Sequence, residues 1–350
     1  MSDEFIADQP AGDRSGNDTR RTGWRRFLPR IGGLALSRPH EDGERSRWVT
    51  GLRWGGSALL AVMLLYYPVG AALVHRINDD PAFNPGVVPA EASNAVAMAA
   101  AIIDREVNQT GWPSNDPWFF PGAVLDNMPN FQAGEIQALQ RVITELRDQI
   151  GRSRGTSSID PGLQNAASAI NTRPDIWYFD LNRSWAPLTP SDNYYRDAMR
   201  SLIDFNTRLV AGQAVFERRA DNLLSTLERI SQDLGAASNK IDQEIDAESA
   251  AWFDTGADDI FYFNKGQLYA YGLLLRALGR DFQPILAEKG ASTIWQRMVD
   301  SMLEGAVLQP LFVVNGEPGS VAQPNHLAEQ GFYLLRARAQ LDELQDILRK

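Results

Sequence analysis

The apolar and polar positions along the chain form one uninterrupted apolar run followed by a series of amphipathic segments. The run WGGSALLAVMLLYYPVGAALV, from Trp54 to Val74, contains no charged residue. A helix of this length rises about 31 Å and crosses the roughly 30 Å hydrocarbon layer of a bilayer. We therefore predict a single membrane-spanning helix at residues 49–75.

Two other interpretations of this run are a buried core helix and a cleaved signal peptide. A chargeless run of this length is rare in soluble domains. The small residues Val69, Gly70 and Ala71 would suit a signal peptidase. However, the apolar core of a signal peptide spans only roughly 7–15 residues and lies close to the N-terminus. We favour an uncleaved anchor, and the sequence leaves open whether the chain is cleaved near Ala71.

Beyond the run, apolar residues recur every three or four positions, which is the period of an amphipathic helix. Strand signals are confined to one short segment, Leu311–Val314. We expect an all-α protein, with one N-terminal transmembrane helix and a large soluble helical bundle of long antiparallel helices. The helices are expected at residues 90–107, 131–150, 159–170, 191–245, 258–278, 292–308 and 326–348.

The longest periodic pattern is an apolar seam from Leu202 to Leu234. It predicts one long helix or a helical hairpin, with Gly235 as a possible break. The seam has two interpretations, namely packing inside the domain and association with a second copy or a partner helix.

Four segments follow from these patterns. Residues 1–48 are rich in Asp, Gly, Arg and Ser and are expected to form a disordered basic cytoplasmic tail. The transmembrane helix at 49–75 is followed by a short stiff linker at 76–89, which contains three prolines. Residues 90–350 form the soluble all-α domain, and no internal repeat is visible.

The charge distribution gives the anchor a direction. Residues 1–76 hold 11 arginines and 8 acidic residues, whereas residues 77–350 hold 23 basic and 36 acidic residues. Because the positive flank of a span stays in the cytoplasm, we expect a bacterial inner-membrane protein with a cytoplasmic N-terminus and a periplasmic domain. The acidic domain would repel phosphate backbones, so nucleic acid is not an expected partner.

The residue types limit the chemistry available to the protein. It has no cysteine, which excludes disulfides and thiolate nucleophiles. Of its three histidines, only His326 falls well inside the soluble domain, so a zinc site built on several imidazoles is not available. We expect no cofactor and no metal, and chemistry would have to use carboxylates.

Three stretches rich in aromatic residues interrupt the helical pattern, at Gly111–Phe131, Trp177–Tyr195 and Ala251–Phe263. One interpretation is that they cover and complete the core of the bundle. The other is an aromatic groove that binds a sugar, lipid or peptide. The candidate groove residues are Trp112, Trp118, Trp177, Trp185, Trp252 and Tyr262.

The third stretch also holds the weak catalytic candidates Asp254, Asp258 and Asp259. One interpretation makes Asp258 the cap of the following helix and places Asp259 near its positive end. The other pairs two carboxylates as acid and base in a cell-wall or glycan hydrolase. The sequence does not give their separation.

The basic tail, the single span and two aromatic motifs resemble an uncharacterised bacterial family, DUF2333. The motifs are WFFPG at Trp118–Gly122 and the segment Trp252–Leu278. This resemblance implies a proteobacterial inner-membrane protein of unknown function, and it supplies no catalytic residues.

The leading hypothesis is a non-enzymatic envelope scaffold that binds a protein or another envelope component. Its partners would be the lipid bilayer and a protein or second copy at the Leu202–Leu234 seam. The alternatives are a carboxylate-based hydrolase and a lipid- or small-ligand-binding domain. The ligand, the partner and the oligomeric state do not follow from the sequence.

Overall fold

The computed structural model describes residues 42–150, 159–180, 183–246, 255–316 and 324–350. Most of the predicted tail at 1–48, together with Asp254 and Trp252, therefore lies outside the described residues. The chain divides into two compact units, Met1–Ser57 and Ala58–Lys350. Within the first unit, the structure describes residues 42–57, all of them in helix α1.

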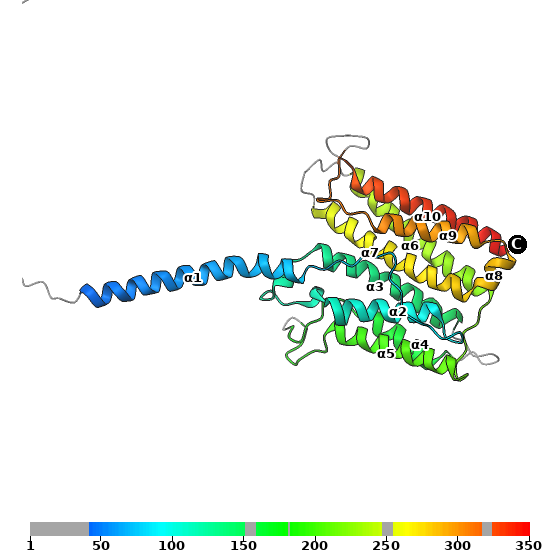
Figure 1. Cartoon of the computed structure of the whole chain (residues 1–350), viewed down its shortest axis with the longest axis horizontal. Coiled ribbons are helices and arrows are strands. Elements are labelled where there is room, and N and C mark those ends of the chain that lie inside the picture. The colour runs from blue at the N-terminus through cyan, green and yellow to red at the C-terminus, as the bar shows by residue number, and fades with distance from the viewer. Residues whose placement is uncertain (1–41, 151–158, 181–182, 247–254, 317–323) are drawn as a thin grey trace, which may run out of the picture. The chain divides into compact units, whose positions relative to one another are not determined.

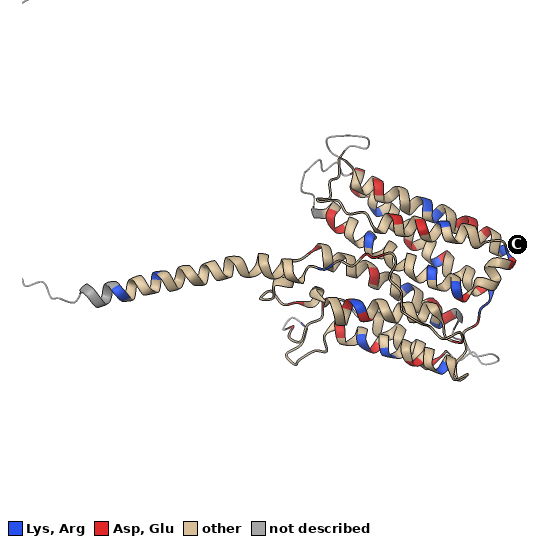
Figure 2. Ribbon diagram, in the orientation of Figure 1, with Lys and Arg blue, Asp and Glu red and all other residues tan. Residues whose placement is uncertain are grey.

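Helix α1 (Asp42–Val74) contains the predicted apolar run and begins earlier than residue 49. Its segment Arg47–Val74 is long and apolar enough to cross a membrane, and its most apolar part has no buried residue. Basic side chains lie near the start of α1 and uncharged residues follow (Figure 2). Pro68 lies inside the helix, which continues through it to Val74.

The rest of the described chain is helical and carries no strand, so the all-α prediction is confirmed (Figure 1). An isolated β-bridge between Asn315 and Asn325 lies beside the segment Leu311–Val314, where a strand was expected. The long helices are α2 (Asn94–Asp104), α3 (Asn127–Glu145), α4 (Pro161–Ile170), α5 (Ser191–Val210), α6 (Ala220–Asp246), α7 (Thr255–Asp281), α9 (Ser292–Ala306) and α10 (His326–Arg349).

Short π-helical turns extend two of these helices, one inside the predicted range 131–150 and one running past the end of the predicted range 90–107. The π-helical turn Arg105–Thr110 continues α2, and a second one at Leu146–Ile150 continues α3. The short helix α8 (Gln283–Glu288) was not predicted. Helix α6 runs straight through Gly235, so the expected break does not occur there.

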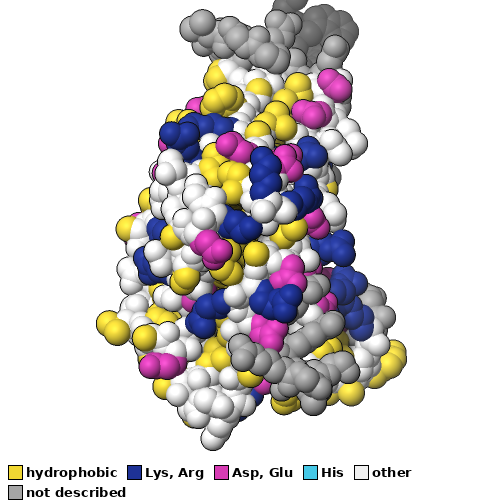
Figure 3. Space-filling model, turned by 90° about the vertical axis from the view of Figure 1, so that its right-hand side faces the viewer, with side chains coloured by type: hydrophobic (Ala, Val, Ile, Leu, Met, Phe, Trp, Pro, Cys, Tyr) yellow, Lys and Arg dark blue, Asp and Glu magenta, His cyan; other side chains and the backbone are white. Residues whose placement is uncertain are grey.

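Successive long helices run in opposite directions, which sorts their connections to two ends of the bundle. The described parts of three connections, residues 111–126, 171–180 with 183–190, and 307–316 with 324–325, lie at the end where α1 joins the domain (Figure 1). The connection 211–219 and helix α8 lie at the opposite end. Figure 3 shows that opposite end, where basic and acidic side chains are interspersed.

The seam from Leu202 to Leu234 falls on two helices with different neighbours. Helix α5 packs on α2 and α4, whereas α6 packs mainly on α10. The apolar side chains of the seam are buried within the single chain: Leu202, Phe205, Leu209, Phe216, Leu223, Leu227, Ile230 and Leu234. Gly212, on the connection between the two helices, is exposed. Packing inside the domain accounts for this pattern, and self-association through it stays a prediction.

The closest helix pair in the bundle is α3 with α7, and two glycines allow their approach. A Cβ added to Gly134 on α3 would lie 2.0 Å from the carbonyl oxygen of Phe263. A Cβ added to Gly266 on α7 would lie 1.9 Å from the carbonyl oxygen of Phe131. Each glycine therefore faces the backbone of the other helix, and any side chain at either position would push the two helices apart.

We expect Gly266→Ala to lower the free energy of unfolding by about 2–4 kcal/mol, because the new methyl group has no room. Urea unfolding of the purified full chain in detergent measures this change. Gly331→Ala on α10 is the matched control, since the nearest side-chain atom would lie at an ordinary 3.6 Å. A loss no larger for Gly266→Ala than for Gly331→Ala would contradict the assignment.

Candidate functional site

The linker that follows α1 is bound to the domain by a buried lysine. Lys265, in the middle of α7, is 2% exposed, and its Nζ lies 2.6 Å from Oδ2 of Asp79. The same amine donates to the carbonyl oxygens of Ala306 and Leu308, at the end of α9. All three ammonium donors are thus used, as a buried charge requires. Burial lowers the pKa of Lys265, and the hydrogen bond to Asp79 opposes this shift.

Other side chains of α7 hold the linker further along. The hydroxyl of Tyr269 donates to the carbonyl oxygen of Asp80 at 2.8 Å. The guanidinium of Arg276 donates to the carbonyl oxygens of Pro81 and Phe83. Because residues 265, 269 and 276 lie on one face of a helix, α7 provides a continuous line of donors for an extended segment. The predicted linker is therefore stiffened by its prolines and attached to α7 by side-chain hydrogen bonds.

A buried cluster of charged side chains contacts both Tyr269 of α7 and Phe83 of the linker. Arg105 bonds Glu106 and Glu135, each at 2.6 Å, and donates to the hydroxyl of Tyr269 at 2.7 Å. Its guanidinium also lies over the ring of Phe83, 4.7 Å from the centroid. Burial, and then the charge of Glu106, raise the pKa of Glu135 well above its usual value. The cluster ties the π-helical turn after α2, helix α3 and helix α7 to the linker, because the turn supplies Arg105 and Glu106, α3 supplies Glu135 and α7 supplies Tyr269.

Three of the six predicted aromatic groove residues, Trp118, Trp177 and Trp185, lie together with other aromatic residues on two connections at the α1 end of the bundle. We use the term aromatic collar for Trp118, Phe119, Phe120, Trp177, Tyr178, Phe179 and Trp185. The ring of Phe119 packs edge-on to Trp118 and to Trp177, with centroids 5.6 and 5.7 Å apart. Trp177 then contacts Tyr178 and Phe179. Trp118 is 79% exposed and Trp185 is 91% exposed, so the collar faces outward.

The remaining groove candidates have other positions. Trp112 is buried, packs edge-on to Tyr195, and donates from Nε1 to the carbonyl oxygen of Pro174. Tyr262 is half-buried beside Phe261 in the second turn of α7. Trp112 thus acts in the core, as the first interpretation of these stretches proposed for aromatic residues.

The two described acidic candidates lie in the first turns of α7 rather than before it. Helix α7 begins at Thr255, so Asp258 is a residue of its first turn and not its cap. Burial, together with the charges of Asp126 and Asp259, raises the pKa of Asp258 to about 6. Asp259 accepts a hydrogen bond from Asn130 on α3 at 2.7 Å. Both carboxylates contact the start of α3, and their pairing as acid and base stays a prediction.

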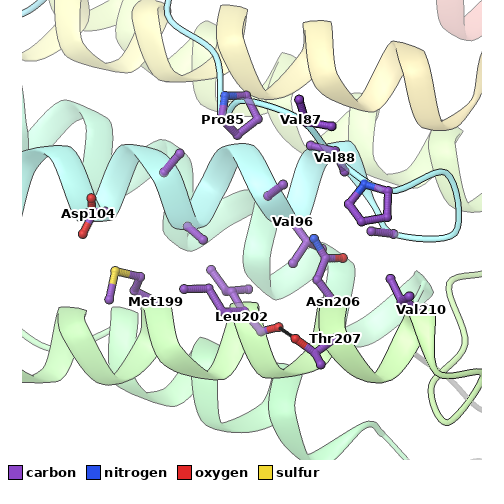
Figure 4. A pocket seen from close by; sticks show the side chains of 16 residues that line it. Pro85, Val87, Val88, Val96, Asp104, Met199, Leu202, Asn206, Thr207 and Val210 are labelled. Carbon is purple, nitrogen blue, oxygen red and sulfur yellow. Dashed lines mark hydrogen bonds between the residues drawn. The ribbon is translucent and has the colours of Figure 1, made fainter.

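An apolar groove lies between α2 and α5, with the end of the linker as a third wall (Figure 4). Its volume is about 490 Å³. Alanines on one face of α2, among them Ala97 and Ala101, leave this space open opposite Ile203. The polar side chains in its wall already bond within the chain, since Asn206 pairs with the backbone of Ser93 and Thr207 donates to Ile203. The groove therefore offers mainly apolar surface.

Sequence reasoning missed the linker contacts and the groove. One signal for Lys265 was present, because it is one of four lysines in the chain and interrupts the apolar face of a strongly helical segment. The alanine-rich stretch before Arg105 was recognised only as a helix. Its small residues also leave room for a groove, but this depends on the neighbour α5, which the sequence does not identify.

These features define a helical-bundle protein with one helix near the N-terminus that is long and apolar enough to cross a membrane. The chain belongs to the family DUF2333, described as an uncharacterized protein conserved in bacteria, which it matches over residues 74–253 and 243–350. This confirms the resemblance seen in the two aromatic motifs. No curated protein and no solved structure matches the chain.

We expect Lys265→Met to lower the free energy of unfolding by about 3–5 kcal/mol, because it leaves Asp79 without its buried partner. Urea unfolding in detergent measures this loss. In the double variant with Asp79→Asn, the two losses should not add, since the second change removes the unpaired charge. Lys240→Met, at an exposed lysine of α6, controls for the loss of one positive charge. Equal losses for the two lysine variants would rule out a structural role for the pair.

Proposed function

We propose that the protein is a non-enzymatic scaffold of the bacterial inner membrane, anchored by α1 with its helical domain in the periplasm. The observation that carries the proposal is the bound linker, with the buried Lys265–Asp79 pair at its centre. A domain on a free linker would sample many positions above the membrane. A domain whose linker is bonded along α7 instead presents its surfaces at a fixed place, which suits a scaffold.

The flanking charges support the proposed direction. Arg47 and Arg53 precede the apolar part of α1, and eight further arginines lie before them in the chain. The positive-inside rule then keeps the N-terminus in the cytoplasm. Membership of a family conserved in bacteria supports the periplasm as the compartment on the other side of the proposed membrane.

A partner surface is available on the outer face of α10. Phe332 and Leu335 are one helical turn apart, and they are 60% and 50% exposed. Adjacent exposed apolar side chains on a helix are typical of a surface that binds a protein. We place the contact with a protein partner there rather than at the buried seam.

The proposal can be tested with single cysteines, because the chain has none of its own. Phe332→Cys carries the probe, a membrane-impermeant maleimide with a photo-crosslinking group, applied to cells whose outer membrane has been made permeable. We expect labelling followed by one discrete crosslinked species. Asn239→Cys, an exposed position on α6, should be labelled without giving that species.

Two results would contradict different parts of the proposal. Labelled Phe332→Cys that gives only monomer would argue against the scaffold role at α10. Labelling of Ser15→Cys, in the N-terminal tail, without labelling of Phe332→Cys would show that the direction of insertion is wrong.

The groove between α2 and α5 favours a second candidate function, the binding of a lipid chain or another apolar ligand. Its 490 Å³ volume lies within the range of small-molecule sites. Its walls come mainly from alanine, valine, leucine and proline side chains. An apolar chain could lie there without leaving any of the groove's polar groups unpaired.

A fatty acid that carries a photoreactive diazirine tests this candidate on the full chain in nanodiscs. We expect crosslinks to peptides from α2 and α5, and a loss of at least about fivefold in Ala101→Leu, which fills the groove. Crosslinks to α1 serve as the internal reference for lipid contact. Ala236→Leu, at an exposed alanine of α6, should leave both signals unchanged. Equal labelling in Ala101→Leu and Ala236→Leu would exclude the groove as the binding site.

A further inference from the structure

We propose that the aromatic collar is a membrane-docking surface that inserts into the lipid headgroup region beside α1. This inference rests on the proposed function, because it requires α1 to span the bilayer. The collar would contact the bilayer leaflet that faces the domain. The collar residues were candidates for a groove that binds a sugar, lipid or peptide, and the lipid surface is the one their position favours.

The collar is joined directly to the apolar part of α1. The hydroxyl of Tyr67 donates to the carbonyl oxygen of Trp118 at 2.8 Å. The hydroxyl of Tyr66 donates to the carbonyl oxygen of Phe119 at 3.1 Å. In an apolar setting these bonds satisfy both the tyrosine hydroxyls and two carbonyl groups of an irregular loop, which is the condition for such a loop to approach lipid.

The contact extends one turn further along α1. A Cβ added to Gly70 would lie 2.5 Å from Cβ of Pro121, so the helix and the loop touch closely. Tyr66 precedes the end of α1 at Val74 by about 12 Å along the helix axis. The membrane-compatible segment Arg47–Val74 has 28 residues and rises about 42 Å, which is about 12 Å more than the hydrocarbon layer. With this excess on the side of the domain, Tyr66 and the loop at Trp118 lie at the edge of the hydrocarbon layer, where the headgroup region begins.

The exposed side chains at this place have the chemistry of that region. Trp, Tyr and Phe combine a large apolar surface with, in Trp and Tyr, a polar group that can face water. Such residues are enriched where membrane proteins cross the headgroup layer. The ring contacts of Trp177 with Phe119 connect the second loop to the first, so both loops present their aromatic residues together.

The collar lies at the end of the bundle that α1 joins, and the surface at the opposite end has a different composition. Its loops lie at the α1 end of the bundle, and Leu311, which is 89% exposed, lies on a third connection at the same end (Figure 1). The opposite end carries interspersed charges (Figure 3). A sugar or peptide site would not need to lie beside an apolar helix, whereas a membrane-docking surface must.

Four Ala→Cys variants of the full chain test the collar by quenching. Each is labelled with an environment-sensitive nitrobenzoxadiazole dye and placed in vesicles of phosphatidylethanolamine and phosphatidylglycerol that contain lipids with quenchers both near the headgroup and along the acyl chain. Ala61→Cys reports on α1, Ala123→Cys and Ala186→Cys on the two collar loops, and Ala211→Cys on the opposite end. All four alanines are exposed.

We expect quenching of at least about twofold at Ala61, Ala123 and Ala186, and none at Ala211. Quenching at Ala61 without quenching at either collar position would overturn the docking surface and leave the anchor intact. Quenching at Ala61 and Ala123 but not at Ala186 would show that the loop of Trp177 and Trp185 is not part of the docking surface. No quenching at Ala61 would overturn the membrane anchor itself, and with it the basis of this inference.

Discussion

The arrangement of the domain depends on the pair formed by Lys265 and Asp79. A lysine in the middle of an otherwise apolar helix face must find partners for three donors or lose its charge. Asp79 supplies one partner and the end of α9 supplies the other two. If the linker left α7, the buried amine of Lys265 would lose Asp79, its charged partner. This one requirement fixes where the linker runs and how the segment from Ala58 onward joins the bundle.

The close contact of α3 with α7 makes this arrangement possible. Gly134 and Gly266 bring the two backbones together, which places Glu135 of α3 beside Arg105 and Tyr269. Tyr269 then reaches the linker on the other side. The buried polar side chains form a connected network rather than isolated pairs. Such networks are costly when they are incomplete, so they favour a single arrangement of the elements they join.

The helices could be predicted from the sequence because each has an apolar face with a period near 3.6. Which helices pack against one another could not be predicted in this way. Leu202 and Leu234 follow one pattern along the chain, yet they lie on α5 and α6, which pack against different neighbours. Local spacing shows that a residue is buried and does not show which helix covers it.

The aromatic stretches show the same limit for the candidate site. The composition of these stretches predicted that Trp112, Trp118 and Trp185 would pack against other apolar surface. Of the three, Trp112 is buried in the core. Trp118 and Trp185 lie at the same end of the bundle only because successive helices alternate in direction and return their connections to that end. That alternation depends on the number of helices between the stretches. The hydrogen bonds from Tyr66 and Tyr67, which join the collar to α1, link residues about fifty positions apart and leave no local pattern.

The central claim is that the bound linker holds the domain in one position against the part of α1 that begins at Ala58. The most direct measurement is the distance between spin labels at Ala61→Cys on α1 and Ala236→Cys on α6, in the full chain in nanodiscs. The bound linker predicts one narrow distance distribution, which should broaden in Lys265→Met. A broad distribution in the unmodified chain, equal to that of Lys265→Met, would contradict the claim.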